Sequence, residues 1–240
     1  MRMVRLLRRR RSRIVYRIRG LVPGKTAVVK CYGNWRDAVP ERNIMRAYGQ
    51  DRRLVRLYAW RVWGGRGYLI MEYVPGPTVN ELVRKMGPLP PERVVALASD
   101  VLKGVEALHR RGIIHGDLHG DNVIVTDLAR GKTKIIDFQH AVKMDRSGTA
   151  RARRTLPIPP PHLAPETRQR RIDPRYDIYG VGFLCATMLA GEAARTQAQL
   201  RRWLANDSPL WRVIAVALDP DPENRFPSAA AMRRALRAAI

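Results

Sequence analysis

The 240-residue sequence is poor in cysteine and in long apolar runs, and each shortage excludes a class of protein. Cys31 and Cys185 lie far apart in apolar runs, which excludes a disulfide framework and a C-x-x-C metal site and favours a reducing cytoplasm. No apolar run reaches the roughly 18–20 residues that a membrane span needs, and the basic start MRMVRLLRRRRSR lacks the apolar core of a signal peptide. We therefore expect a soluble, cytoplasmic protein without a membrane span.

Acidic residues are also scarce, because 45 Lys and Arg face 21 Asp and Glu and give a formal net charge of +24. The positive electrostatic field of such a surface attracts ATP, nucleic acid or acidic proteins. A compositional bias toward Arg on a solvated surface explains the same excess of basic residues. Nucleic acid therefore stays open as a partner of this basic surface. The proportion of hydrophobic residues, 45%, is that of a globular protein and not of a disordered one.

The periodicity of apolar residues changes near the sequence Pro75-Gly76-Pro77. Before it, short β-branched segments predict strands at 13–19, 26–32, 54–63 and 67–74, with one helix at about 36–48. After it, a period of 3.6 predicts helices at 80–86, 91–111, 175–190, 195–205, 209–218 and 227–239, with short strands at 123–126 and 133–138 and a loop at about 139–165. We expect a single α+β domain over 1–240, with a small β-rich N-lobe at about 1–74 and a larger helical C-lobe at 75–240.

One segment carries a specific chemical pattern. The run His115-Gly116-Asp117-Leu118-His119-Gly120-Asp121-Asn122 is followed, fifteen residues after Asn122, by Asp137-Phe138-Gln139. It resembles the catalytic loop and the metal-binding motif of the protein-kinase superfamily. Phosphoryl transfer needs a carboxylate that orients the attacking hydroxyl, and it needs ligands for Mg²⁺. The resemblance implies the first role for Asp117 and the second for Asn122 and Asp137.

Other kinase motifs follow in the same order along the chain. Lys30 ends the strand-like run AVVK, and Glu41 lies where the helical partner of the kinase lysine is expected. Leu163-Ala164-Pro165-Glu166 is similar to the A-P-E motif, and Arg225 is placed like its distant partner. Asp177 is similar to the aspartate that anchors the catalytic loop. The resemblance covers the chain from about residue 13 to its C-terminus and implies a bilobal kinase fold with ATP and Mg²⁺ as cofactors.

The same resemblance implies a nucleotide pocket. Its adenine would lie between Val15 and Val28 on one side and Ile124 on the other, with Met71 at the back and the backbone of Glu72 to Val74 as the hinge. Apolar walls and backbone hydrogen bonds suit a flat heteroaromatic base.

The sequence departs from the family at the glycine-rich phosphate loop, whose glycines would fall at Arg8, Arg10 and Arg13. Three interpretations of the run Arg8–Arg13 are open. Guanidinium groups replace the backbone amides that glycine exposes to phosphate, or the run is a disordered basic arm, or it contacts RNA or DNA.

The catalytic loop HGDLHxxN is also atypical, since Gly116 and His119 replace the usual Arg and Lys, and it is similar to loops of small-molecule kinases. A zinc site from H-x-D-x-H would need further ligands. Pro159 replaces the threonine usual in Ser/Thr kinases, which leaves the acceptor open. Ser147, Thr149 and Thr155 are hydroxyl candidates for self-phosphorylation.

The leading hypothesis is an ATP-dependent Ser/Thr protein kinase, because an A-P-E motif with an arginine partner is typical of protein-phosphorylating members. The first alternative is a small-molecule or RNA-associated kinase, which His119, Gly116 and the basic charge favour. The second is a pseudokinase that serves as a binding module, which the missing glycines favour.

Overall fold

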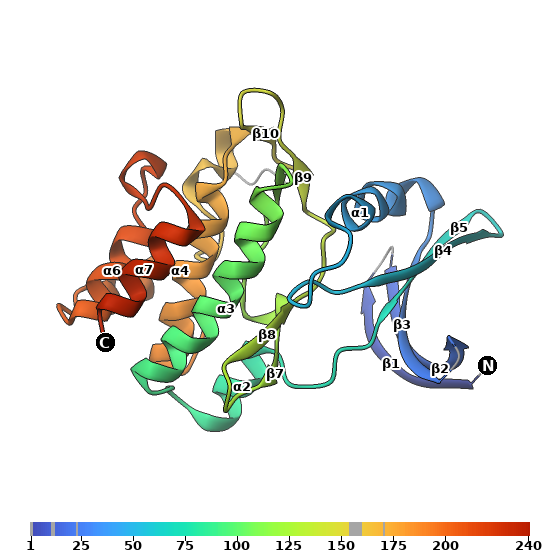
Figure 1. The fold of residues 1–240 in the computed structure, drawn as a ribbon, viewed down its shortest axis with the longest axis horizontal. Coiled ribbons are helices and arrows are strands. Elements are labelled where there is room, and N and C mark those ends of the chain that lie inside the picture. The colour runs from blue at the N-terminus through green and yellow to red at the C-terminus, as the bar shows by residue number, and fades with distance from the viewer. Residues whose placement is uncertain (1, 11–12, 23, 154–159, 170) are drawn as a thin grey trace.

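The computed structural model describes residues 2–10, 13–22, 24–153, 160–169 and 171–240. A β-sheet with one helix lies at one end of the molecule and a group of helices at the other, with the N-terminus in the first part and the C-terminus in the second (Figure 1). The predicted bilobal α+β architecture is confirmed. The boundary near residue 74 stays a prediction.

The N-lobe is built on a five-stranded antiparallel sheet in the order β1-β2-β3-β5-β4. Its strands are β1 (Arg2–Arg10), β2 (Arg13–Val22), β3 (Lys25–Tyr32), β4 (Leu57–Trp63) and β5 (Arg66–Glu72). The hairpin predicted for 13–19 and 26–32 is confirmed, and its register pairs Val15 with Lys30. This register places a branched apolar side chain on the strand next to the lysine.

Residues 2–10 form a strand, β1, which rules out one of the three interpretations of the run Arg8–Arg13. Arg2–Arg10 pairs antiparallel with β2, and Arg8 lies opposite Val15, so the disordered-arm interpretation is wrong for these residues. A row of arginines hides the period-two pattern by which a strand is predicted, but an edge strand tolerates charge because one of its sides faces solvent. Leu6 and Leu7 are accordingly exposed.

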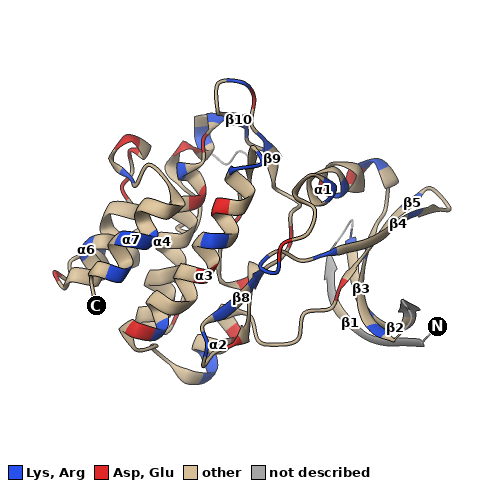
Figure 2. Ribbon diagram, viewed as in Figure 1, with Lys and Arg blue, Asp and Glu red and all other residues tan. Residues whose placement is uncertain are grey.

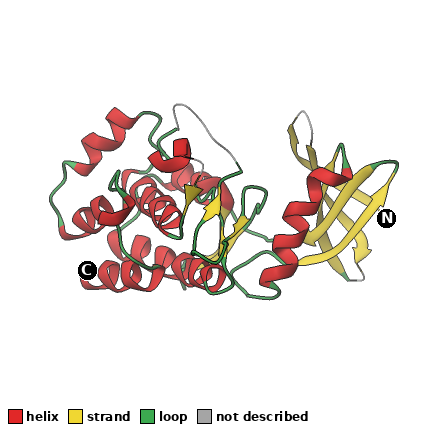
Figure 3. Ribbon diagram, turned by 90° about the horizontal axis from the view of Figure 1, so that it is seen from above, coloured by secondary structure: helices red, strands yellow, loops and turns green. Residues whose placement is uncertain are grey.

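One helix, α1 (Trp35–Tyr48), accompanies this sheet (Figure 3). The side chain of Asn34 caps its first turn by accepting a 2.9 Å hydrogen bond from the Arg36 amide, and the helix ends at Gly49, whose φ of 67° suits a residue without a side chain. The buried face carries Glu41, which is thereby directed toward the interior.

The C-lobe is helical, as predicted. It comprises α2 (Val79–Met86), α3 (Pro91–His109), α4 (Arg175–Ala190), α5 (Gln197–Leu204), α6 (Pro209–Ala217) and α7 (Ala229–Ala238), with the 3₁₀ turns η1 (Gly120–Asn122), η2 (Pro165–Gln169) and η3 (Pro222–Asn224). The helix α3 contacts both α4 and α7. No helix in the described part of the chain is both long enough and apolar enough to cross a membrane.

Short strands in the C-lobe carry the motif residues to the side that faces the sheet. They are β6 (Ile113–Ile114), β7 (Val123–Asp127), β8 (Lys132–Ile135), β9 (Val142–Lys143), β10 (Ala150–Arg151) and β11 (Arg171–Ile172). The predicted strand at 133–138 ends at Ile135 because Asp137 adopts a φ of 61°. The segment predicted as a loop from 139 to 165 contains β9 and β10.

Candidate active site

Lys30 is held by two carboxylates from opposite lobes. Its Nζ lies 2.9 Å from Glu41 of α1 and 2.7 Å from Oδ1 of Asp137, and its side chain is only 6% exposed. The ion pair predicted between Lys30 and Glu41 is present. Tyr32, which sequence reasoning missed, donates its hydroxyl to Oε2 of Glu41 and fixes the carboxylate from the other side.

The charges of this group reinforce one another. Burial lowers the pKa of Lys30, but the charges of Glu41 and Asp137 outweigh burial and hold the pKa well above its usual range. Burial likewise raises the pKa of Asp137, and the charge and hydrogen bond of Lys30 overcome it and hold that pKa well below its usual range. Lys30 is therefore cationic and Asp137 anionic at neutral pH.

The catalytic-loop backbone is anchored by Asp177 of α4. Its Oδ2 accepts a 2.9 Å hydrogen bond from the His115 amide, and its Oδ1 accepts one of the same length from the Gly116 amide. Nε2 of His109 lies 2.9 Å from Oδ2 as well. Gly116 has a φ of 73°, and a Cβ there would lie 2.9 Å from the carbonyl oxygen of His140, so any side chain at this position would be strained.

Asp117 and Asn122 lie together in this loop. Nδ2 of Asn122 donates to the Asp117 carbonyl at 2.8 Å, which leaves its Oδ1 for the predicted role as a metal ligand. Nε2 of His119 lies 3.1 Å from the same Nδ2 and 3.7 Å from Oδ2 of Asp117. Burial raises the pKa of Asp117, but the nearby His119 ring and the charges of His119, His140 and His115 outweigh it and lower the pKa to about 2.

The second predicted metal ligand follows a strand that is tied to this loop. The amide of Ile136 donates to the carbonyl of Asn122 at 2.9 Å. This hydrogen bond places Asp137, the next residue, beside the catalytic loop. Phe138 is fully buried, with its ring centroid 4.6 Å from that of Tyr48 on α1 and 4.9 Å from that of His115. This packing joins the metal-binding motif to α1 and hence to Glu41.

An apolar cavity of about 420 Å³ lies between the lobes. Every residue predicted to bind the nucleotide lines it: Val15, Val28, Lys30, Met71, Glu72, Val74, Ile124 and Asp137. Tyr73 of the predicted hinge and Asp121 of the catalytic loop line it as well, and sequence reasoning missed Leu7, Val55, Thr78, Glu81 and Ile136. These belong to no motif, and only the folding of distant segments brings them to the cavity.

A second cavity, of about 450 Å³, shares Val15, Lys30, Asp121 and Asp137 with the first and is polar. It adds Arg13, Asp117, His119, Gln139, His140 and His162. Arg13, the last position of the missing glycine motif, therefore lies at this cavity, and its charge contributes to the low pKa of Asp137. The side chains of Arg8 and Arg10 lie outside what the structure describes.

The predicted partner of the A-P-E glutamate is in place. Arg225 donates to both carboxylate oxygens of Glu166, at 2.6 and 2.8 Å, and its side chain is fully buried. Ser147 and Thr149 lie at an exposed turn around Asp145. Thr155 and Pro159 lie outside the described residues.

A family model of the protein kinase domain matches residues 15–231. The chain belongs to the protein kinase family. In this kinase domain, Lys30, Asp117 and Asp137 each line one or both of the two adjoining cavities.

Two curated relatives are similar to parts of the kinase domain. Serine/threonine-protein kinase PknL of Mycobacterium tuberculosis is 34% identical over 147 residues, which are 61% of this chain and 36% of that protein. Serine/threonine-protein kinase PknB of Mycobacterium leprae is 28% identical over 183 residues, 69% of this chain and 29% of that protein. The chain spans about a third of the length of these relatives.

Proposed function

We propose that this chain is an Mg²⁺- and ATP-dependent kinase that phosphorylates serine or threonine hydroxyls of proteins. The observation that carries the proposal is the position of Lys30, which bridges Glu41 and Asp137 at the edge of an apolar cavity. A cation there fits the phosphates of a nucleotide whose base occupies the apolar part.

The residue roles follow from these positions. Lys30, locked by Glu41, would hold the α- and β-phosphates, while Val15, Val28, Met71 and Ile124 would enclose adenine and the backbone of Glu72 to Val74 would contact its edge. Mg²⁺ neutralises the triphosphate when bound, and the hard oxygen atoms of Asn122 and Asp137 suit it. Asp117, ionised at neutral pH, would orient the acceptor hydroxyl for in-line attack.

Two observations support a protein acceptor. The Glu166–Arg225 pair stabilises the segment after the metal motif, and the named relatives are serine/threonine-protein kinases. His119 beside Asp117 favours the small-molecule or RNA-associated alternative, because it takes the place of the lysine usual in protein kinases. The net charge of +24 suits an acidic acceptor or nucleic acid. A cytoplasmic location suits the two free, buried cysteines.

The test is Mg²⁺-dependent ATP turnover and phosphate transfer to a mixed Ser/Thr protein substrate by the wild type and by Asp137→Ala. We expect turnover to fall by at least about a hundredfold, because the variant lacks a metal ligand and the anionic partner of Lys30. Asp145→Ala removes a carboxylate from an exposed turn and serves as the matched control.

Equal turnover in wild type and Asp137→Ala would remove the assignment. ATP binding without turnover in the wild type would favour the pseudokinase alternative. Transfer to an RNA or a small alcohol, with none to protein hydroxyls, would favour the first alternative.

A further inference from the structure

A histidine pair lies beside the carboxylate of Asp117. Among the described residues, one group of His, Cys, Asp and Glu side chains brings three donor atoms within 4.8 Å of one another, and it consists of Asp117, His119 and His162. His119 and His162 come from segments far apart in the sequence, yet their ring centroids lie 5.0 Å apart. The group contains Asp117 and His119 of the sequence motif H-x-D-x-H but not His115, and His162 supplies the third donor.

A second observation at the same place is an unpaired carboxylate oxygen. Oδ1 of Asp117 is buried and has no hydrogen-bond partner. A buried acceptor without a donor is costly. A cation bound at this point would satisfy it.

The geometry points to a site for a zinc-like divalent cation held by Asp117, His119 and His162. Two imidazoles and one carboxylate are the donor set that borderline transition metals prefer, whereas Mg²⁺ prefers oxygen ligands. Ligand atoms around one tetrahedral Zn²⁺ lie about 3.3 Å apart when the bonds are about 2.0–2.1 Å long. Oδ2 of Asp117 lies 3.7 Å from Nε2 of His119, and the three donor atoms lie within 4.8 Å of one another, so the side chains must rotate to bring the unpaired Oδ1 and the two ring nitrogens to that separation.

The carboxylate of Asp121 lies behind His119, at a separation too long for a hydrogen bond in this structure. Ligation through Nε2 puts the ring proton on Nδ1, which lies 3.9 Å from Oδ2 of Asp121. A carboxylate behind a metal-bound imidazole fixes its tautomer and raises its basicity. The cost is two contacts: the 3.3 Å hydrogen bond that Nδ1 accepts from the Asp121 amide, and the 3.1 Å contact between Nε2 and Nδ2 of Asn122. Three protein ligands leave one open position for water.

The site would act as an inhibitory switch on the proposed kinase, on whose function this consequence rests. The bound cation would occupy the carboxylate that orients the acceptor hydroxyl. It would also tie the segment before the A-P-E motif, through His162, to the catalytic loop. Zn²⁺ would therefore block transfer while the nucleotide cavity, lined by other side chains except for Asp121, keeps its shape.

The first measurement is a Co²⁺ titration of the full chain, followed by the visible absorption of the bound ion, with Zn²⁺ as the competing ion. We expect saturation near one equivalent, displacement by Zn²⁺, and no displacement by millimolar Mg²⁺. His162→Asn should weaken Co²⁺ binding by at least about tenfold. His140→Asn is the matched control, because His140 lines the same cavity but is not one of the three ligands.

Equal Co²⁺ affinity in wild type, His162→Asn and His119→Asn, each folded by circular dichroism, would overturn the site. The second histidine variant keeps the test decisive if the first fails to fold. The consequence for activity is tested by Zn²⁺ inhibition of transfer at saturating Mg-ATP, which His162→Asn should relieve at least tenfold. Metal binding without any kinase activity would support the site and remove the proposed function, whereas activity without metal binding would remove only the site.

Discussion

Glu166 and Arg225 form an ion pair that is shielded from water. The guanidinium is fully buried and donates to both carboxylate oxygens, and its Nε donates to the carbonyl of Asp219. Removing one partner of a buried pair leaves an uncompensated charge, which typically costs about 3–5 kcal/mol. Replacing both partners by well-packed apolar groups of similar volume is often neutral, since the desolvation cost of the charges disappears as well.

We therefore predict that Arg225→Met lowers the free energy of unfolding by about 3–5 kcal/mol, measured by urea denaturation at pH 7. The double variant Glu166→Gln/Arg225→Met should recover at least half of that loss. Arg201→Met, at an exposed position of α5, should change stability by less than about 0.5 kcal/mol. A double variant as unstable as the single one would show that the carboxylate is not what the guanidinium stabilises.

Motif residues could be predicted from sequence because phosphoryl-transfer chemistry restricts their identity and order. Lys30 and Glu41 meet, and Asn122 lies beside Asp117, as expected. Tyr32 and His162 could not be predicted as members of the site, since no spacing relates them to it and only tertiary contacts bring them there.

At the scale of elements, α4 depends on glycine where it meets the catalytic loop. A Cβ at Gly180 would lie 2.8 Å from both the Cβ and the carbonyl oxygen of Leu118, which no real Cβ contact allows. Replacing a helix glycine by alanine normally stabilises the helix by about 1 kcal/mol. Overpacking a buried contact costs about 1–3 kcal/mol. At Gly180 this cost outweighs the gain in helix propensity, so alanine lowers the free energy of unfolding.

We predict that Gly180→Ala lowers the free energy of unfolding by about 1–2 kcal/mol and reduces ATP turnover by displacing Leu118 beside Asp117. Gly104→Ala in α3 is the matched control, because its Cβ would meet the flexible end of Ile135 at 3.0 Å and Cβ of Arg53 at 3.2 Å. The control should be close to neutral in urea denaturation. Stabilisation of both variants would show that helix propensity outweighs packing here.

The helices of the C-lobe could be predicted to within a few residues because most of them carry apolar residues with a period of 3.6, whereas α4 is mostly apolar and buried on all sides over Tyr176–Met188. The predicted helix 91–111 corresponds to α3 (Pro91–His109), and 175–190 matches α4. The strand β1 could not be predicted from the sequence. Five of the nine residues in Arg2–Arg10 are arginine, and an edge strand needs no continuous apolar face. Its pairing is set by the neighbouring β2 rather than by its own pattern.

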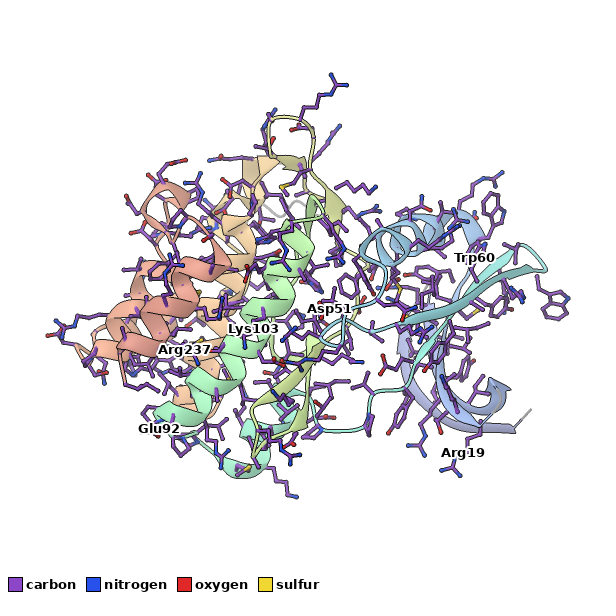
Figure 4. All side chains as sticks on the ribbon, viewed as in Figure 1. Arg19, Asp51, Trp60, Glu92, Lys103 and Arg237 are labelled. Carbon is purple, nitrogen blue, oxygen red and sulfur yellow. The ribbon has the colours of Figure 1, made fainter. Side chains whose placement is uncertain are left out.

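At the scale of the whole molecule, positive charge is spread over both lobes (Figure 2). One cavity of about 480 Å³ gathers Lys103 of α3 and Arg237 of α7, whose side chains are labelled in Figure 4. Burial and the charges of Arg53, Arg233 and Arg237 outweigh the attraction of Asp100 and lower the pKa of Lys103. A lysine whose pKa is lower in the folded state than in the unfolded state destabilises the fold wherever it is protonated, hence at pH 7.

We predict that Lys103→Gln raises the melting temperature at pH 7 in 10 mM salt and that the gain shrinks in 0.5 M NaCl. The Debye length falls from about 30 Å at 0.01 M to about 3 Å at 1 M, so salt screens the neighbouring arginines. Lys85→Gln, in the last turn of α2, removes the same unit of charge from an exposed position where a cation favours the helix dipole. Equal stabilisation of the two variants would mean that the overall charge of +24 limits stability. If only Lys103→Gln is stabilising, the loss of stability in the wild type comes from the repulsion between cations that are crowded together between α3 and α7.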